Sequence, residues 1–260
     1  MQLEVILGLG IPFLGTMLGA AVVFFLKKGV PLLVEKFMLG FAAGVMIAAS
    51  VFSLLLPAME EVERLHQNSW LVTAVGFLLG IFFLLILDEI IPHIHVDSDQ
   101  EEGIHTSWKK TTKLFFAMTL HNIPEGMSLG IVFAGLYTAD TTLTIEGALA
   151  LSMGIAIQNF PEGAVLSLPL HSQGMSRMKS FILGTASGIV EPIGAFLTIL
   201  FSSVLQPILP WLLAFAAGAM VYVCVEELIP QSQQGKHTNI ATIAFALGFA
   251  CMMILDTALG

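Results

Sequence analysis

The sequence predicts an all-α polytopic membrane protein, and three observations support this fold class. Of the 260 residues, 56% are hydrophobic and only 11% are charged, whereas a soluble domain carries about 25% charged residues. The apolar residues form runs as long as a membrane-spanning helix requires, roughly 20 residues. The connections between these runs are short. The formal net charge of −9 offers no basic surface for nucleic acid, so nucleic-acid binding is not expected.

Eight apolar stretches follow one another along the chain, and each is predicted to cross the lipid bilayer as a helix. In the first stretch the lysines come after the apolar run, so we expect a retained helix rather than a signal peptide. The longest polar stretch, 92–113, is predicted to be a cytoplasmic loop that contains histidines and acidic residues. The predicted helices cover residues 5–26, 37–59, 70–91, 114–137, 146–170, 179–204, 208–229 and 240–259 of one transmembrane domain, 1–260.

The basic residues predict how these eight helices are oriented. The connections after the first, third, fifth and seventh helices lie on one side, and nine of the ten lysines and arginines fall there, whereas Arg64 lies on the other side. Cytoplasmic connections are the ones enriched in Lys and Arg. We therefore expect both termini outside the cytoplasm, in a multi-pass protein of the cell membrane. The nine residues are Lys27, Lys28, Lys36, Lys109, Lys110, Lys113, Arg177, Lys179 and Lys236.

Two short motifs recur in the two halves of the chain. Phe41-Ala-Ala-Gly44 of the second helix recurs as Phe215-Ala-Ala-Gly218 in the seventh, and Ile86-Leu-Asp88 of the third recurs as Ile254-Leu-Asp256 in the eighth, at a similar offset. The matched helices cross in opposite directions, so the pattern predicts a 3+2+3 plan with an inverted repeat, which is typical of transporters. Helices rich in Ala and Gly also resemble one another by composition alone, and this alternative stays open.

The fourth and fifth helices carry two similar hexapeptides, His121-Asn-Ile-Pro-Glu-Gly126 and Gln158-Asn-Phe-Pro-Glu-Gly163. Residues three and four apart lie on one face of a helix, so the imidazole or amide of each motif projects together with its glutamate. Two such faces would bring imidazole nitrogen, carboxylate oxygens and amide oxygens into one pocket. A mixed set of this kind suits divalent first-row ions, zinc among them. A proline inside each motif frees a backbone carbonyl and bends the helix there.

The negative charges of the acidic residues in these helices require compensating positive charge. A charged side chain at the bilayer centre costs roughly 2.5–3.5 kcal/mol on insertion scales, and Glu125, Glu162 and Glu191 are all placed at such depth by the predicted spans. No lysine or arginine is predicted at the same depth. The positive charge must therefore come from a bound cation or from protons. A dication satisfies the requirement; a proton network remains the alternative.

These motifs are similar to those of the ZIP (Zrt/Irt-like) divalent-metal transporters, and the stretch Gly40–Ser50 resembles the bacterial GufA-type branch. The resemblance covers the whole chain and includes Glu191-Pro192 in the sixth helix. It implies transport of Zn²⁺ into the cytoplasm, with Fe²⁺, Mn²⁺ and Cd²⁺ as further candidate ions. It also implies a homodimer, a rocking or elevator-like movement of the unit that holds the fourth and fifth helices, and no resident cofactor, because the metal is the substrate.

The resemblance further implies a two-metal centre. His121, Glu125, Gln158 and Glu162 would line one site, with Met46 of the second helix as a soft ligand. The adjacent site would use Asn122, Asn159 and Glu191 and share the glutamates of the first. Some family members have Asp where this chain has Asn159, which lowers the charge of the second site here. A core methionine is the alternative interpretation of Met46.

Acidic groups near the helix ends predict a route for cations. Ser53 and an external cluster would lie on the entry side, and the pairs Asp88-Glu89 and Glu226-Glu227 on the exit side, near the histidines of 92–113. Clustered like charges raise the local concentration of counter-ions, but ordinary solvated acids at an aqueous interface explain these positions as well. The external cluster comprises Glu60, Glu61, Glu63 and His66, and the loop residues are His93, His95, Asp97, Asp99, Glu101, Glu102 and His105.

Two other functions compete with transport. An intramembrane metal-dependent hydrolase needs three protein ligands, an open position on the zinc and a general base, and neither His-Glu-x-x-His nor Gly-x-Ser-x-Gly occurs in the chain. A membrane cytochrome needs paired axial histidines, and His121 is the only histidine predicted at membrane depth. We therefore expect a transporter and not an enzyme.

Overall fold

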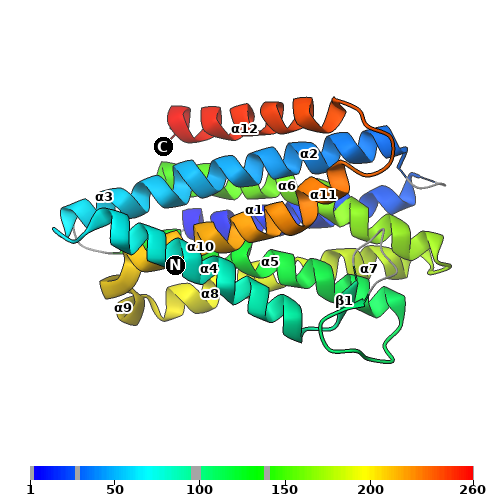
Figure 1. The fold of residues 1–260 in the computed structure, drawn as a ribbon, viewed down its shortest axis with the longest axis horizontal. Helices are drawn as coiled ribbons and strands as arrows, with labels where there is room; N and C mark the ends of the chain where they lie inside the picture. Colours follow the sequence, from blue (N-terminus) through cyan, green and yellow to red (C-terminus); the bar gives the residue numbers. More distant parts are fainter. Residues whose placement is uncertain (1–2, 27–29, 95–100, 138–140, 260) are drawn as a thin grey trace.

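A computed structural model describes residues 3–26, 30–94, 101–137 and 141–259. These residues form long helices that run along one axis, and a small hairpin interrupts them in the 92–113 connection (Figure 1). The hairpin pairs β1 (His93–Ile94) with β2 (Glu101–Glu102) antiparallel, with His93 opposite Glu102. His95, Asp97 and Asp99, which the sequence analysis placed in a metal-collecting loop, lie outside the described residues.

The helices follow the predicted order, with local irregularities that the sequence analysis did not predict. Several long helical segments are composites, and π-helical turns lie inside two of them. The elements are α1 (Leu3–Ala21) with η1 (Val22–Phe24); α2 (Leu32–Ala49), η2 (Ser50–Leu55) and α3 (Leu56–Arg64); α4 (Ser69–Ile90); α5 (Lys110–Gly135); α6 (Ile145–Ser172); α7 (Arg177–Ser187) and α8 (Val190–Leu200); α9 (Ser202–Leu205), η3 (Gln206–Ile208), α10 (Leu209–Val223), η4 (Cys224–Leu228) and α11 (Ile229–Ser232); and α12 (Ile240–Leu259).

Six helical segments of the described chain are long and apolar enough to cross a membrane. The protein is therefore an all-α polytopic membrane protein. Helices α5 and α6 are 26 and 28 residues long but are not among the six, since their polar hexapeptides lower their hydropathy. Eight crossings and external termini thus stay predictions. The six segments are Leu3–Phe24, Leu32–Arg64, Ser69–Ile90, Arg177–Leu200, Ser202–Ser232 and Ile240–Leu259.

Large apolar side chains face outward along the outer helices. Leu79 and Phe82 of α4 are each 53% exposed, and Ile243 of α12 is 57% exposed. In water such continuous apolar faces would cause association, whereas lipid covers them at no cost. The apolar core lies between α2, α5, α6 and α10 and includes Met46, Leu151 and Met220.

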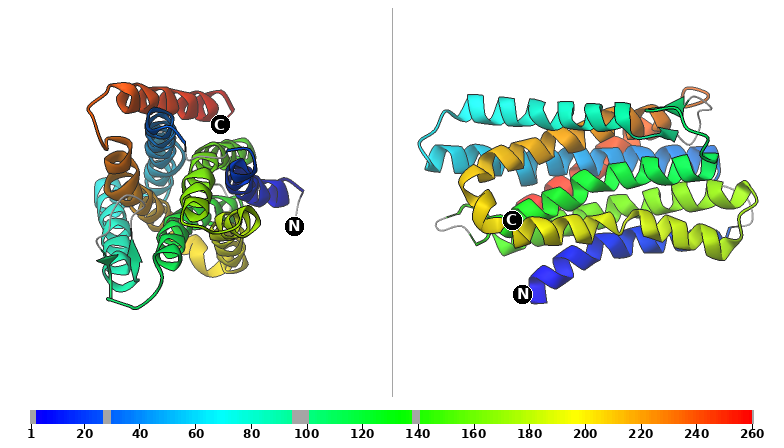
Figure 2. Two further views of the ribbon diagram at one scale, coloured as in Figure 1. Left: turned by 90° about the vertical axis from the view of Figure 1, so that its right-hand side faces the viewer. Right: turned by 90° about the horizontal axis from the view of Figure 1, so that it is seen from below.

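The helices pack in pairs that are distant in sequence. Helix α1 packs along α6 and α5 along α8, while α2 packs along α12 and α4 along α10; the end-on view in Figure 2 shows α12 against α2 and α1 against α6. The first two pairs and α7 form one unit, and the last two pairs form a second unit. Contacts of α2 with α6 and of α10 with α5 join the units.

Glycines allow the two pairs of the second unit to approach closely. A Cβ on Gly44 would overlap the backbone oxygen of Phe245, and one on Gly248 would overlap that of Phe41. In the α4–α10 pair, Gly218 meets Phe77 and Gly80 meets Phe215 in the same way. The repeated Phe-Ala-Ala-Gly motif therefore makes equivalent helix contacts in both halves of the chain.

Candidate metal site

The two hexapeptides lie in continuous helix, and their polar side chains are buried. Pro124 lies inside α5 and Pro161 inside α6, and both helices continue past their proline. The predicted ligands on α5, α6 and α8 are all buried. Their exposed fractions range from 8% for His121 to zero. The covered ones are Asn122, Glu125, Gln158, Asn159 and Glu191, and Glu162 is 2% exposed. The structure thus gathers these seven residues in the interior.

The three amides of the site share one arrangement. In each, the nitrogen donates a hydrogen bond to another residue, and the oxygen has no hydrogen-bond partner among the described residues. Asn122 Nδ2 donates to the backbone oxygen of Ser187 at 3.0 Å, and Gln158 Nε2 donates to Glu125 Oε1 at 2.6 Å. Asn159 Nδ2 donates to Glu191 Oε2 at 2.8 Å. The oxygens of all three amides are buried and accept no hydrogen bond from any described residue. Their protein partners therefore set the direction in which these oxygens point.

The carboxylates add three more oxygens of the same kind. Glu125 Oε2 and both oxygens of Glu162 are buried without a hydrogen-bond partner in the described chain. Glu125 lies close enough to Glu162 and Glu191 for the three charges to repel one another. No lysine or arginine of the described ranges forms an ion pair with them. Since a buried charge without compensation is very unfavourable, these six oxygens form a donor set suited to a cation.

His121 takes a different partner from the one that the sequence analysis expected. Its Nε2 lies 2.9 Å from Glu227 Oε1, so the imidazole contacts η4. Among the described residues, no three His, Cys, Asp or Glu side chains already form a metal-binding group. His121 would have to leave Glu227 to share a metal with Glu125. Met46 is fully buried and belongs to the apolar core, so its role as a soft ligand stays a prediction.

A chain of polar groups leads from this site toward the hairpin end. A small pocket beside His121 is lined by Asp88, Tyr222, Glu226 and Glu227, among others. Tyr222 donates its hydroxyl to Asp88 at 3.0 Å, and His93 Nε2 lies 3.0 Å from the other oxygen of Asp88. Of the residues predicted on the exit side, Asp88, Glu226 and Glu227 line this pocket and Glu89 does not; His93 contacts Asp88 from β1.

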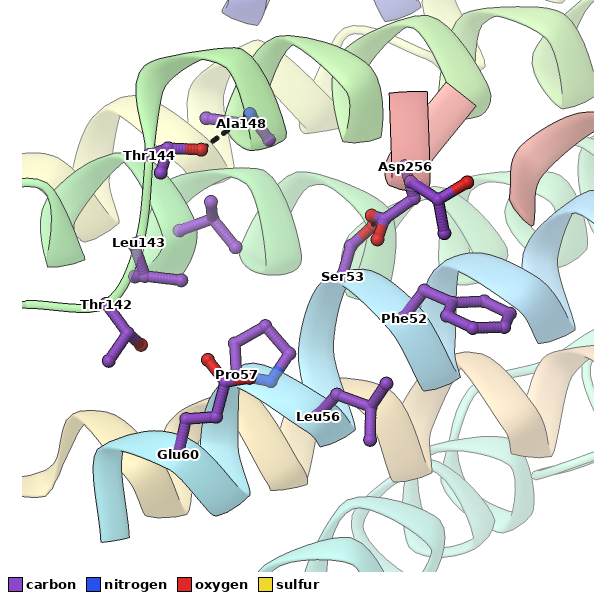
Figure 3. A pocket seen from close by; sticks show the side chains of 13 residues that line it. Phe52, Ser53, Leu56, Pro57, Glu60, Thr142, Leu143, Thr144, Ala148 and Asp256 are labelled. Carbon is purple, nitrogen blue, oxygen red and sulfur yellow. Dashed lines mark hydrogen bonds between the residues drawn. The ribbon is translucent and has the colours of Figure 1, made fainter. Parts of the chain in front are cut away.

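A second pocket, of about 350 Å³, lies at the opposite end of the bundle. Ser53 donates to Asp256 Oδ1 at 2.6 Å on its wall, and Glu60 also lines it (Figure 3). The sequence predicts Ser53 and Glu60 on the entry side but does not predict Asp256, which lines the same pocket. The match between Asp88 and Asp256 in the repeated motif was the signal that could have found it.

Glu61 is not a free external acid, which corrects its predicted role in gathering cations. It is completely buried and accepts hydrogen bonds from Arg64, from the hydroxyl of Thr141 and from the backbone N–H of Thr142 at 2.7 Å. Thr141 and Thr142 belong to the connection between α5 and α6. The carboxylate of Glu61 therefore ties α3 to that connection.

Comparisons with known proteins show which sequences this chain resembles. Residues 97–256 match the family described as the ZIP zinc transporters. The chain is 33% identical to zinc transporter ZIP11 of Xenopus tropicalis over 94% of either chain. It is 37% identical to zinc transporter GufA of Myxococcus xanthus, over 80% of this chain and 81% of the relative, and 36% identical to zinc transporter ZIPB of Bordetella bronchiseptica, over 98% of this chain and 81% of the relative.

Proposed function

The chain belongs to the ZIP family of zinc transporters, and from this premise we propose that it moves Zn²⁺ across the membrane into the cytoplasm through a site between α5 and α6. The observation that carries the proposal is the group of six buried oxygens without donors. Three come from amides and three from carboxylates. Zn²⁺ accepts carboxylate oxygen as a ligand, and Fe²⁺, Mn²⁺ or Cd²⁺ are further candidate substrates.

The ligands are proposed to come first from Glu125 and Glu162, whose free oxygens are anionic. Gln158, Asn122 and Asn159 add neutral oxygens whose direction is already set by their nitrogen contacts. His121 joins the metal by releasing Glu227. This set extends over both sites of the predicted two-metal centre.

The route is proposed to run from the pocket of Ser53 and Asp256 to the site and then past His121 and Glu227 to Asp88. The orientation with external termini and the eight crossings belong to the same proposal. The equivalent glycine contacts of α2–α12 and α4–α10 support an inverted repeat, because similar composition alone does not require them. The homodimer and the location in the cell membrane rest on the resemblance to the family.

The intramembrane hydrolase has no support from the site. Its zinc would need an open position for water and a nearby general base, whereas the relatives are named as transporters. The site is therefore proposed to bind and release the ion without chemical change.

The test is uptake of Zn²⁺ by purified protein in liposomes. Glu125→Ala removes one of the free carboxylate oxygens, so uptake should fall at least about 10-fold, because even the loss of an outer group that orients a metal ligand typically costs 10- to 100-fold. Glu146→Ala is the matched control, because Glu146 lies on the exposed first turn of α6 and should leave uptake unchanged. Normal uptake by a correctly folded Glu125→Ala protein would remove the proposed site.

A further inference from the structure

We propose that Glu61 of α3 is a releasable latch, which fastens the connection between α5 and α6 to the second unit and has to open in each transport cycle. This role rests on the proposed function, because transport through the site requires the two units to move relative to each other. It goes beyond that function by naming the contact that the movement breaks and the contact that survives it.

Glu61 divides its hydrogen bonds between two sets of donors, one set for each oxygen. Oε1 accepts from Thr141 Oγ1 at 2.9 Å, and from the backbone N–H and the hydroxyl of Thr142 at 2.7 and 3.2 Å. Oε2 accepts from Arg64 Nε at 2.9 Å and from Arg64 Nη2 at 2.6 Å. The residue is completely buried. One oxygen therefore holds the connection, and the other holds a residue of the same helix.

The bonds to Oε1 join the two units of the molecule. Thr141 and Thr142 lie between α5 and α6, the helices that carry both hexapeptides. Glu61 lies on α3, which packs against α4 and α10 of the second unit. A shift of the first unit along the second therefore has to break the bonds to Oε1, whereas the bonds to Oε2 move with α3.

The latch lies at the edge of the entry pocket. Glu60, the neighbour of Glu61, lines the pocket together with Thr142, Leu143 and Thr144 of the connection. Figure 3 shows Thr142 and Glu60 on the same side of the pocket. When the bonds to Oε1 break, the connection can move away from α3 and widen the pocket at this edge. The closed latch thus limits access to the site from the entry side.

Arg64 makes the latch reversible. Removing every partner of a buried carboxylate would be strongly destabilising, but Arg64 keeps its bonds to Glu61 when the connection leaves. The side chain of Arg64 is 28% exposed, so water can reach the pair and solvate the released oxygen. A hydrogen bond to a charged group typically shifts an equilibrium by about 10-fold or more. The bonds to Oε1 can therefore favour one arrangement of the units without making it permanent.

The first experiment locks the latch. Glu61→Cys and Thr142→Cys are combined with Cys251→Ala, since Cys251 is partly exposed and Cys224 is buried, and the new pair is joined by a short, cleavable bifunctional thiol reagent. With the link in place, Zn²⁺ uptake in liposomes should fall at least about 10-fold, because the units can no longer separate. Cleavage should restore the uptake of the unlinked variant. Uptake at the unlinked rate with the link in place would overturn the proposal.

Zn²⁺ binding and a second linked pair are the controls. Zn²⁺ affinity of the linked protein should stay within about twofold, since no proposed ligand is altered. Leu71→Cys with Val75→Cys gives a matched pair at two exposed positions four residues apart near the start of α4. A link there lies within one unit and should leave uptake unchanged. Equal losses of uptake in both linked proteins would overturn the proposal, because a lock between the units would not be their cause.

The second experiment weakens the latch and does not need the linked pair. Thr141→Val with Thr142→Val removes two of the donors to Oε1 and keeps the shape of both side chains. Ala148, a buried residue of the pocket wall, is replaced in the Cys251→Ala chain by cysteine as a reporter. A thiol reagent should label it about 10-fold faster when the two hydroxyls are absent, because the latch opens more often.

Thr198→Val is the control for the loss of a threonine hydroxyl. The hydroxyl of Thr198 bonds the backbone oxygen of Gly194 on its own helix, so its loss should not change the labelling rate. A merely structural contact between the connection and α3 would not expose Ala148→Cys on weakening. An unchanged labelling rate in the double valine variant would therefore overturn the latch.

Failure of the latch and failure of the proposed function give different results. If wild-type protein does not bind Zn²⁺, or if Glu125→Ala takes it up normally, the proposed function is wrong. If Glu125→Ala stops uptake while the linked protein transports at its unlinked rate, only the role of Glu61 is wrong.

Discussion

Single side chains of the site owe their direction to partners on other helices. Gln158 is oriented by Glu125, and Asn159 by Glu191, through contacts that join α6 to α5 and to α8. An amide can present either its nitrogen or its oxygen, and the acceptor decides which one. The carboxylates of Glu125 and Glu191 thus orient the amides of Gln158 and Asn159 through these hydrogen bonds.

Asn159→Asp should lower stability without metal and increase the stabilisation by Zn²⁺. Aspartate cannot donate to Glu191, and it places a second negative charge against that carboxylate. The lost contact to a buried charged acceptor costs about 1–3 kcal/mol, whereas a bound dication would compensate the added charge. Thermal melting in chelator and in excess Zn²⁺ measures both effects. Asn239→Asp, at an exposed position before α12, should change neither, and a variant at 159 that melts as the wild type does in chelator would contradict the prediction.

Asp256→Ala should weaken entry of the ion and leave its passage through the site intact. Asp256 lines the pocket of Ser53, so it should raise the local concentration of cations there. We expect the KM of Zn²⁺ uptake to rise about 3- to 10-fold, with the maximal rate close to that of the wild type. Glu63→Ala, an exposed acid outside that pocket, is the control. An unchanged KM in Asp256→Ala would exclude this pocket from the route.

Periodicity and composition of the sequence were sufficient to predict where the helices lie, but not where they are irregular. The apolar runs predicted the positions of the helices, because a run of that length can satisfy its backbone in lipid only as a helix. The interruption at Gly188 and the π-helical turns of η2 and η4 were not predicted. The interruption at Gly188 depends on a neighbour, because Gly188 leaves space for Thr16, which lies on a helix distant in sequence. Local sequence carries no such information.

Gly44→Ala and Gly218→Ala should destabilise the protein by similar amounts. In each case the new methyl group would overlap a backbone oxygen of the paired helix, and overpacking of this kind typically costs about 1–3 kcal/mol. Gly10→Ala is the matched control, because no atom lies near the added carbon and alanine favours helix. Thermal melting in detergent compares the three variants. Equal stability of Gly44→Ala and Gly10→Ala would be inconsistent with the close helix contact.

At the scale of the whole molecule, the site belongs to one unit and its access route to both. The proposed ligands on α5 and α6, together with α1 and α8, lie in the first unit. The contacts of His121 with Glu227 and of Thr142 with Glu61 cross from the first unit to the second. Relative movement of the units would therefore break these two contacts and leave the ligand set together, which fits the proposed transport.

Much of the candidate site could be predicted from the sequence because its signals are local. The two hexapeptides place amide, proline and glutamate at helical spacing, and the structure buries all of them together with Glu191. The contact between His121 and Glu227 could not be predicted, since these residues belong to different units. Glu61 was misjudged for the same reason, because its donors include a connection that follows it by about two helices.

The sequence by itself determined that this protein lies in lipid as helices and that acidic and amide side chains are placed within them. Chain composition decides this, because long apolar runs must satisfy their own backbone and charges within them need a partner. Only the tertiary structure decided which partner each side chain meets. Thr16, for example, reaches Glu191 across 175 residues of chain. Such a contact depends on how helices cross, and spacing along one helix does not contain that geometry.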